Sequence, residues 1–242
     1  MMSTGKFATI HMMNIDASVI VGERKTIARQ IAEALRDAIV CLELKPGDTI
    51  SESDIGARFG VSRQPVREAF IQLSEAGLVR VRPQRPTEIV KISVREVLNA
   101  RFVREALELA VMRKATAAGP ALAEGHFEPL LRRQAAVAEG DDYRVFHALD
   151  DAFHQEIARI AGCDFVWKLV DTQKMQMDRV RYLSLRFNMA PAVEEHRMIA
   201  AAIHAGDAER AEACLRLHLS RIDVHIRQIR EEFREFFVDD ED

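Results

Sequence analysis

The chain has 242 residues, of which 48% are hydrophobic and 30% are charged, and its formal net charge is −4. This length accommodates one large domain or two modest ones with a well-formed core. No stretch reaches the ~18 uninterrupted apolar residues of a membrane span, no signal-peptide pattern opens the chain, and Cys41, Cys163 and Cys214 form no C-x-x-C pair, so we expect a cytoplasmic protein with reduced thiols and no membrane partner.

The first predicted elements are short helices. Apolar residues recur every four positions in the first of them, at Ile27, Ile31, Leu35 and Ile39. Residues 51–59 predict a second helix with Ser51 as its N-cap, and Gly60 ends it. Residues 62–76 predict a third, with Ser62 as the cap. The last two helices, joined by a tight glycine turn, are typical of a helix-turn-helix.

Two strand-like runs follow the third helix. They cover Leu78–Arg82 and Glu88–Ile92 and flank the turn sequence PQRP, which predicts a hairpin wing. Between residues 58 and 85 there are six arginines and only two acidic residues. A local basic face inside an acidic chain indicates a part that binds nucleic acid.

The third predicted helix begins with side chains suited to contacting DNA bases. Helices of this kind enter the major groove with their N-terminal residues at the base edges. Here those residues are Arg63, Gln64 and Arg67, whose groups suit guanine, adenine or phosphate. The wing adds Arg82 and Arg85, which we expect at the DNA backbone or in the minor groove. The alternative is an arginine-rich surface that only contacts solvent.

This segment resembles a known family. The stretch LKPGDTISESDIGARFGVSRQPVREAFIQLSEAGLVRVRPQR is similar to the winged helix-turn-helix of the GntR family of bacterial transcription regulators. The resemblance implies that Arg63, Gln64 and Arg67 face double-stranded operator DNA. The chain departs from the family at the wing tip, where Arg85-Pro86 replaces the usual Arg-Gly, and proline removes a backbone donor.

From Ser93 the sequence predicts helices only. The predicted helices cover residues 93–119, 126–138, 142–161, 164–186, 191–204 and 207–237, with breaks at EGDD, AGCD, FNMAP and AGD. We therefore predict a mostly α protein: a winged helix-turn-helix domain at residues 1–92, including a short N-terminal tail, and an all-α antiparallel bundle at residues 93–242.

Polar residues interrupt the apolar faces of three bundle helices. Asp150 and His154 lie one turn apart among phenylalanines and isoleucines, while His196 and His218 occupy the apolar sides of two later helices. A single histidine in such a place is usually a hydrogen-bonded core residue. Three histidines and an aspartate instead favour a divalent metal site for Zn, Ni or Mn.

The same region resembles the FCD ligand-binding domain of the FadR-like branch of that family. Its motifs match at Arg104–Glu108, Asp150–His154, Glu195–Ile203 and Gly206–His218. The resemblance implies that Asp150, His154, His196 and His218 are the metal ligands. It also implies a homodimer and a small carboxylic acid as effector.

These features predict a ligand-responsive regulator, which we expect to be a repressor released by its effector; an activator is the alternative. Arg104 is our candidate for a bidentate clamp on the effector carboxylate, although an ordinary salt bridge is an equal possibility. Arg181 and Arg186 are weaker candidates. Two other functions stay open: a metal-dependent enzyme, although no general-base motif is present, and a bundle in which the metal has a purely structural task.

Overall fold

The computed structural model describes residues 25–118 and 125–239, which form two compact units. One unit contains the described residues up to Ser93 together with those from Phe233 onward, and the other is Val94–Glu232. The predicted N-terminal tail and the predicted helix end at Gly119-Pro120 lie outside the described residues. None of the described helices combines the length and apolar character needed to cross a bilayer.

The N-terminal unit has the predicted three helices, α1 (Ile27–Val40), α2 (Glu52–Phe59) and α3 (Arg63–Glu75). The Ser51 side chain accepts a hydrogen bond from the Asp54 N–H, as its predicted capping role requires. Gly60 ends α2 with a φ of 65°, a left-handed conformation that favours glycine. Ser62 occupies the N-cap position of α3, but its side chain makes no capping hydrogen bond there.

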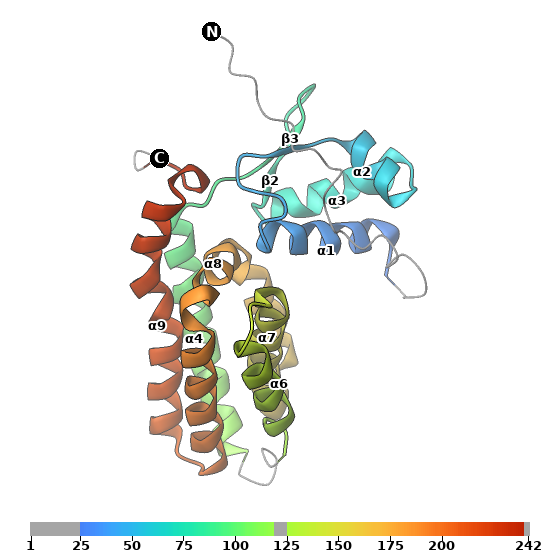
Figure 1. The fold of residues 1–242 in the computed structure, drawn as a ribbon. Helices are drawn as coiled ribbons and strands as arrows, with labels where there is room; N and C mark the ends of the chain where they lie inside the picture. The colour runs from blue at the N-terminus through green and yellow to red at the C-terminus, as the bar shows by residue number, and fades with distance from the viewer. Residues whose placement is uncertain (1–24, 119–124, 240–242) are drawn as a thin grey trace. The chain divides into compact units, whose positions relative to one another are not determined.

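A three-stranded antiparallel sheet completes this unit, in the order β1-β3-β2. The strands are β1 (Thr49–Ile50), β2 (Val79–Arg80) and β3 (Thr87–Ile89), so the two strands of the predicted wing are shorter than expected and a third strand joins them. Val79 pairs with Ile89, and Ile50 pairs with Thr87. Figure 1 shows the wing as a narrow loop between β2 and β3.

The end of the chain also belongs to this unit. The predicted helix over 207–237 is too long, because α9 (Ala208–Glu232) ends earlier and the short 3₁₀ helix η3 (Arg234–Phe236) follows. The Ile92 N–H donates to the Phe236 carbonyl at 2.8 Å, and the Val238 N–H donates to the Ile92 carbonyl at 3.0 Å. Phe236 and Phe237 are buried. The burial of these two side chains compensates for the helical turn that α9 would otherwise form here.

The second unit is the predicted helical bundle, so the fold class is confirmed. Besides α9 it contains α4 (Val94–Ala117), α6 (Glu128–Ala138), α7 (Tyr143–Ile160) and α8 (Asp164–His204). Figure 1 shows α4, α9 and the later part of α8 running alongside one another, with α6 and α7 on the other side of α8.

The predicted break between two helices at Phe187–Pro191 is wrong, because α8 is a single helix across it. The helix continues through Pro191, but Figure 1 shows its ribbon turning over between its two halves. Asp150 contacts both Arg181 and His196, although these lie fifteen positions apart, about 22 Å in a straight helix. A proline removes one helical hydrogen bond and crowds the preceding turn, so a helix supported on both sides bends there instead of ending.

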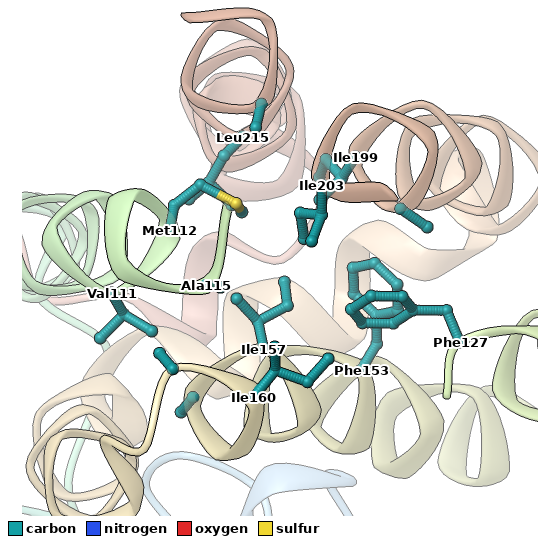
Figure 2. Close-up of a cluster of buried hydrophobic side chains, with 14 of the residues drawn as sticks. Val111, Met112, Ala115, Phe127, Phe153, Ile157, Ile160, Ile199, Ile203 and Leu215 are labelled. Carbon is teal, nitrogen blue, oxygen red and sulfur yellow. The ribbon is translucent and has the colours of Figure 1, made fainter. Parts of the chain in front are cut away.

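An apolar core joins the four longest bundle helices. Figure 2 shows side chains from each of them pointing toward one another: Met112 and Ala115 from α4, Phe153 and Ile157 from α7, Ile199 and Ile203 from α8, and Leu215 from α9. This core holds the same turns of α7, α8 and α9 that carry the polar residues of the candidate site.

Candidate metal centre and DNA-binding surface

Four polar side chains meet inside the bundle: Asp150, His154, His196 and His218. Each offers one ligand atom, all four residues are buried, and these atoms lie within 4.8 Å of one another. The structure therefore brings together all four residues that the sequence analysis singled out. They come from α7, from the later half of α8 and from α9, so the bundle must be folded before the cluster exists.

The distances within the cluster fit one shared ion. The Nε2 atom of His218 lies 3.2 Å from that of His154 and 3.4 Å from that of His196. The His196 Nε2 also lies 3.4 Å from Asp150 Oδ1. Ligands about 2.1 Å from one ion are roughly 3.0–3.4 Å apart at octahedral or tetrahedral angles.

The other nitrogen of each imidazole faces an acceptor. His154 Nδ1 lies 2.6 Å from Glu108 Oε2, and His218 Nδ1 lies 3.0 Å from Glu195 Oε2. His196 Nδ1 lies 2.9 Å from Gln134 Oε1, and Gln134 in turn donates to the Leu149 carbonyl. For His196 and His218 these contacts are hydrogen bonds, which keep the proton on Nδ1 and direct the Nε2 lone pair inward, as metal-ligating histidines require. The close approach of Glu108 to His154 lacks hydrogen-bond geometry.

Burial fixes the protonation states that a metal needs. Desolvation lowers the pKa of His154 and holds the pKa of His196 well below its usual value, so both rings stay neutral. Burial alone opposes ionisation of Asp150, but the Arg181 guanidinium holds its pKa well below the usual range. Neutral imidazoles and an ionised carboxylate form a donor set for a divalent cation.

Asp150 is also part of a buried ionic network. Arg181 contacts Asp150 on its Oδ2 oxygen, so Oδ1 faces the histidines. The same guanidinium contacts Asp178 and lies 2.9 Å from Asp151. Lys174 joins Asp151 and Asp178 at 2.7 Å and 2.8 Å. Arg181 is therefore saturated by three carboxylates, which leaves it poorly placed to clamp an effector.

A pocket of about 40 Å³ opens beside the cluster. Asp150 and His218 line it together with Arg104, His147, Asn188 and Arg221. Two buried atoms of the lining residues have no hydrogen-bond partner among the described residues, Arg104 Nη2 and Asn188 Oδ1, while His147 Nε2 lies 3.7 Å from Asp178 Oδ1. Buried polar atoms are rarely left in this state, so water or a small polar ligand is expected to contact them.

Arg104 and Arg186, the two remaining candidates for binding the effector carboxylate, differ in their surroundings. Arg104 Nε donates to Glu108 at 2.5 Å, the carboxylate that faces His154, while its Nη2 stays available in the pocket. Arg186 contacts Glu232 and lies over the Phe187 ring. It does not line this pocket, so Arg104 is the better of the predicted candidates.

Sequence reasoning assigned no role to Glu108, Gln134 and Glu195. Glu108 and Glu195 stand inside motifs that the sequence displays, beside Arg104 and His196, and their contacts with His154 and His218 now explain them. Gln134 has no such signal, because it reaches His196 across 62 positions of the chain. Only the packing of α6 on α8 brings the two together.

The predicted DNA-binding residues lie on the other unit. Arg63, Gln64 and Arg67 are exposed at the start of α3, and Arg82 and Arg85 are exposed on the wing. Arg67 makes two hydrogen bonds to Glu52 of α2, at 2.9 and 3.0 Å, and Gln64 donates to Glu68. Arg82 lies 3.9 Å from Glu88. These contacts fix Arg67 against α2 within the helix-turn-helix.

Comparison with known proteins identifies both units. Residues 27–89 match the model of bacterial regulatory proteins of the gntR family, and residues 100–221 match the FCD domain. The HTH-type transcriptional repressor RspR of Escherichia coli is 38% identical over 216 residues, covering 88% of this chain and 95% of that protein. A probable D-xylose utilization operon transcriptional repressor of Paenarthrobacter nicotinovorans is 32% identical, covering 81% and 87%.

Solved structures agree on the architecture. E. coli McbR/YncC has a TM-score of 0.73 at 20% identity and covers 85% of this chain and 99% of that one, a likeness of fold. A putative GntR transcriptional regulator from Rhodococcus sp. RHA1 has a TM-score of 0.70 at 25% identity and covers 83% and 97%. The chain therefore belongs to the GntR family with an FCD domain and is a DNA-binding transcription regulator, not an enzyme.

Proposed function

We propose that this regulator is a cytoplasmic homodimeric repressor that senses a small carboxylic acid through a divalent ion. Asp150, His154, His196 and His218 would hold the ion. The single observation that carries this proposal is the convergence of three Nε2 atoms and one carboxylate oxygen within 4.8 Å, with all three Nδ1 atoms facing acceptors. Three imidazoles and one carboxylate suit Zn, Ni or Mn.

The pocket beside the cluster supports a small anionic effector. When bound, the ion would supply a Lewis acid for a carboxylate. Arg104 Nη2 would donate to the same carboxylate from the α4 side, because it is buried and has no partner among the described residues. Asn188 Oδ1 would accept a hydrogen bond from a hydroxyl of the acid.

The size of the pocket favours a short acid. One water needs roughly 10–15 Å³ of such volume, so a pocket of about 40 Å³ holds a few non-hydrogen atoms. A hydroxy acid of a few carbons fits this space, while a longer sugar acid would require the bundle to open. This preference belongs to the pocket alone and does not depend on which divalent ion is bound.

On the DNA side, we propose that Arg63, Gln64, Arg67, Arg82 and Arg85 contact the operator. A dimer would place two α3 helices on two half-sites, and their separation would decide the fit to the operator. An effector that prefers one arrangement of the bundle shifts this equilibrium by its differential affinity. Two relatives, RspR and the D-xylose utilization regulator, are named as repressors, which favours release of DNA by the effector.

The experiment measures DNA release. DNA selected from a random pool by the metal-loaded protein is labelled, and its fluorescence anisotropy is followed with propanoate, 2-hydroxypropanoate and 2,3-dihydroxypropanoate, with and without a chelator. We expect the hydroxy acids to release DNA only when Zn²⁺, Ni²⁺ or Mn²⁺ is present. Equal release in the presence of chelator would refute metal-dependent sensing, and the ion would then have a structural role only.

Two variants sharpen this experiment. His196→Ala removes a proposed ligand, and His204→Ala changes an exposed histidine of the same helix. The first should bind DNA without responding to the acids, while the second should behave as the unmodified protein. A response that survives in both variants would remove His196 from the site.

A further inference from the structure

The two carboxylate oxygens of Asp150 have different neighbours. Oδ1 lies 3.4 Å from His196 Nε2 and 4.0 Å from His218 Nε2. Oδ2 accepts a hydrogen bond from Arg181 Nη2, and it also lies 4.0 Å from His154 Nε2. Both oxygens therefore border the histidine cluster, and the Arg181 guanidinium engages one of them.

Arg181 is itself held in place by a buried network. Its Nη1 donates to Asp178 Oδ1, and its Nη2 also lies 2.9 Å from Asp151 Oδ1. Lys174 binds the second oxygen of each of these carboxylates, at 2.7 Å from Asp151 Oδ2 and 2.8 Å from Asp178 Oδ2. Because Arg181 and Lys174 are both buried, the planar guanidinium has a fixed direction toward Asp150.

This contact determines how Asp150 can bind an ion. A carboxylate that accepts a charge-assisted hydrogen bond on one oxygen is directed to a metal through its other oxygen. The four candidate ligands then supply one donor atom each. An ion that takes six donors, such as Mn²⁺, keeps two positions for water or an acid. A carboxylate that bound through both oxygens, as in many calcium sites, would fill one of them.

A purely stabilising role for Arg181 is the alternative. The network ties α7 to the earlier half of α8, and Lys174 contributes to this connection as much as Arg181 does. The two cations differ in one respect, since the contacts between described residues connect only Arg181 to Asp150. Lys174 is therefore the internal control for a role at the metal centre.

We propose that Arg181 is a positioning residue that restricts Asp150 to one metal-binding oxygen and thereby keeps a coordination position open for the acid. The inference rests on the proposed metal centre. It adds the residue that sets the number of open positions on the ion. The buried network of Arg181, Lys174, Asp151 and Asp178 would then serve sensing as well as stability.

Double variants that preserve the charge balance test this role. Arg181→Met with Asp151→Asn and Lys174→Met with Asp151→Asn share one change and differ only in the cation that is removed. Combining each methionine with Asp178→Asn instead gives a second pair of the same design. Every variant removes one positive and one negative charge, so none leaves an additional unpaired charge in the bundle.

The probe is Mn²⁺ alone, bound at one ion per chain to the full-length protein in ²H₂O. Pulsed electron paramagnetic resonance counts the water molecules on the ion through their deuterons. We expect the unmodified protein and both Lys174 variants to hold the same number. The Arg181 variants should hold about half as many, because the freed oxygen of Asp150 replaces one of two waters.

Equal water counts in the Arg181 and Lys174 variants would overturn the inference and leave the metal centre in place. Loss of Mn²⁺ binding or of the fold in both Arg181 variants, with both Lys174 variants intact, would also overturn it and assign Arg181 a structural role. An unmodified protein that binds Zn²⁺ but not Mn²⁺ would remove the premise of an ion with six donors. An unmodified protein that binds neither ion would instead contradict the proposed metal centre, and the inference with it.

Discussion

Each histidine of the cluster has its own acceptor, and the acidic acceptors have their own arginines. Glu108 lies between His154 and Arg104, and Glu195 lies between His218 and Arg221. Burial would raise the pKa of both carboxylates, but the charge of Arg104 lowers the pKa of Glu108, and the contacts with His218 and Arg221 lower the pKa of Glu195. The arrangement orients the rings and leaves Asp150 as the one anionic donor among the four candidate ligands.

Removing such an acceptor should weaken metal binding. Glu195→Gln keeps the shape of the side chain but loses the charge that orients His218, and changes of this kind cost about 10–100-fold in metal affinity. Competition with a chromophoric chelator for Zn²⁺ measures the effect. Glu194→Gln is the matched control, because Glu194 is the exposed neighbour and pairs with Arg197. Equal affinities of the two variants would argue against the orienting role of Glu195.

The buried histidines also predict a pH dependence for the metal-free protein. Burial keeps the pKa of His154 and His196 below the value of 6.5 that they have in an unfolded chain. Below pH 6.5 the unfolded chain therefore takes up protons that the folded protein does not, so stability falls as the pH falls. We expect the Tm in excess chelator to drop between pH 7.5 and pH 5.5.

His196→Gln should make this drop smaller, because one of the depressed histidines is gone. His204→Gln, at an exposed position of the same helix, should leave the drop unchanged. Thermal unfolding followed by circular dichroism at both pH values measures the difference. A His196→Gln profile as steep as that of the unmodified protein would show that His196 contributes nothing to the acid sensitivity.

At the scale of the elements, local signals determine most of what the sequence predicts. The Ser51 cap, the Gly60 turn and the helical stripe of α1 depend on neighbours a few positions away, and the structure has all three. The continuous α8 and the pairing of Ile92 with Phe237 depend on contacts between distant segments. The candidate ligands followed from periodicity and from family motifs, whereas Gln134 and the role of Arg181 required the packed bundle.

The turn of the helix-turn-helix gives a prediction at this scale. Gly60 has a φ of 65° and open space where a Cβ would lie, so Gly60→Ala adds backbone strain without a clash. A left-handed alanine costs about 1–2 kcal/mol, and urea unfolding measures this loss. Gly140→Ala at the end of α6 should be nearly neutral, because Gly140 has no such φ and its nearest atom lies 3.8 Å from the added carbon. A neutral Gly60→Ala would disprove the strain argument.

At the scale of the whole molecule, the helical bundle would couple the binding of ion and acid to the binding of DNA. The ion would hold together α7, the later half of α8 and α9, which are otherwise joined by apolar contacts around Phe153 and Ile199. A ligand that binds only the folded bundle stabilises it by mass action. A regulator of this design ties the packing of α4 and α9 to the presence of ion and acid, and the attached DNA-binding units would respond to that packing.

The most direct measurement is the metal content of the purified full-length chain after loading with Zn²⁺ and removal of excess ion, determined by elemental mass spectrometry. We predict one ion per chain for the unmodified protein and for His204→Ala, and clearly less than that for His196→Ala, because this variant loses one of the four donors and the Gln134 contact that orients it. Equal ion content in His196→Ala and His204→Ala would contradict the proposed centre.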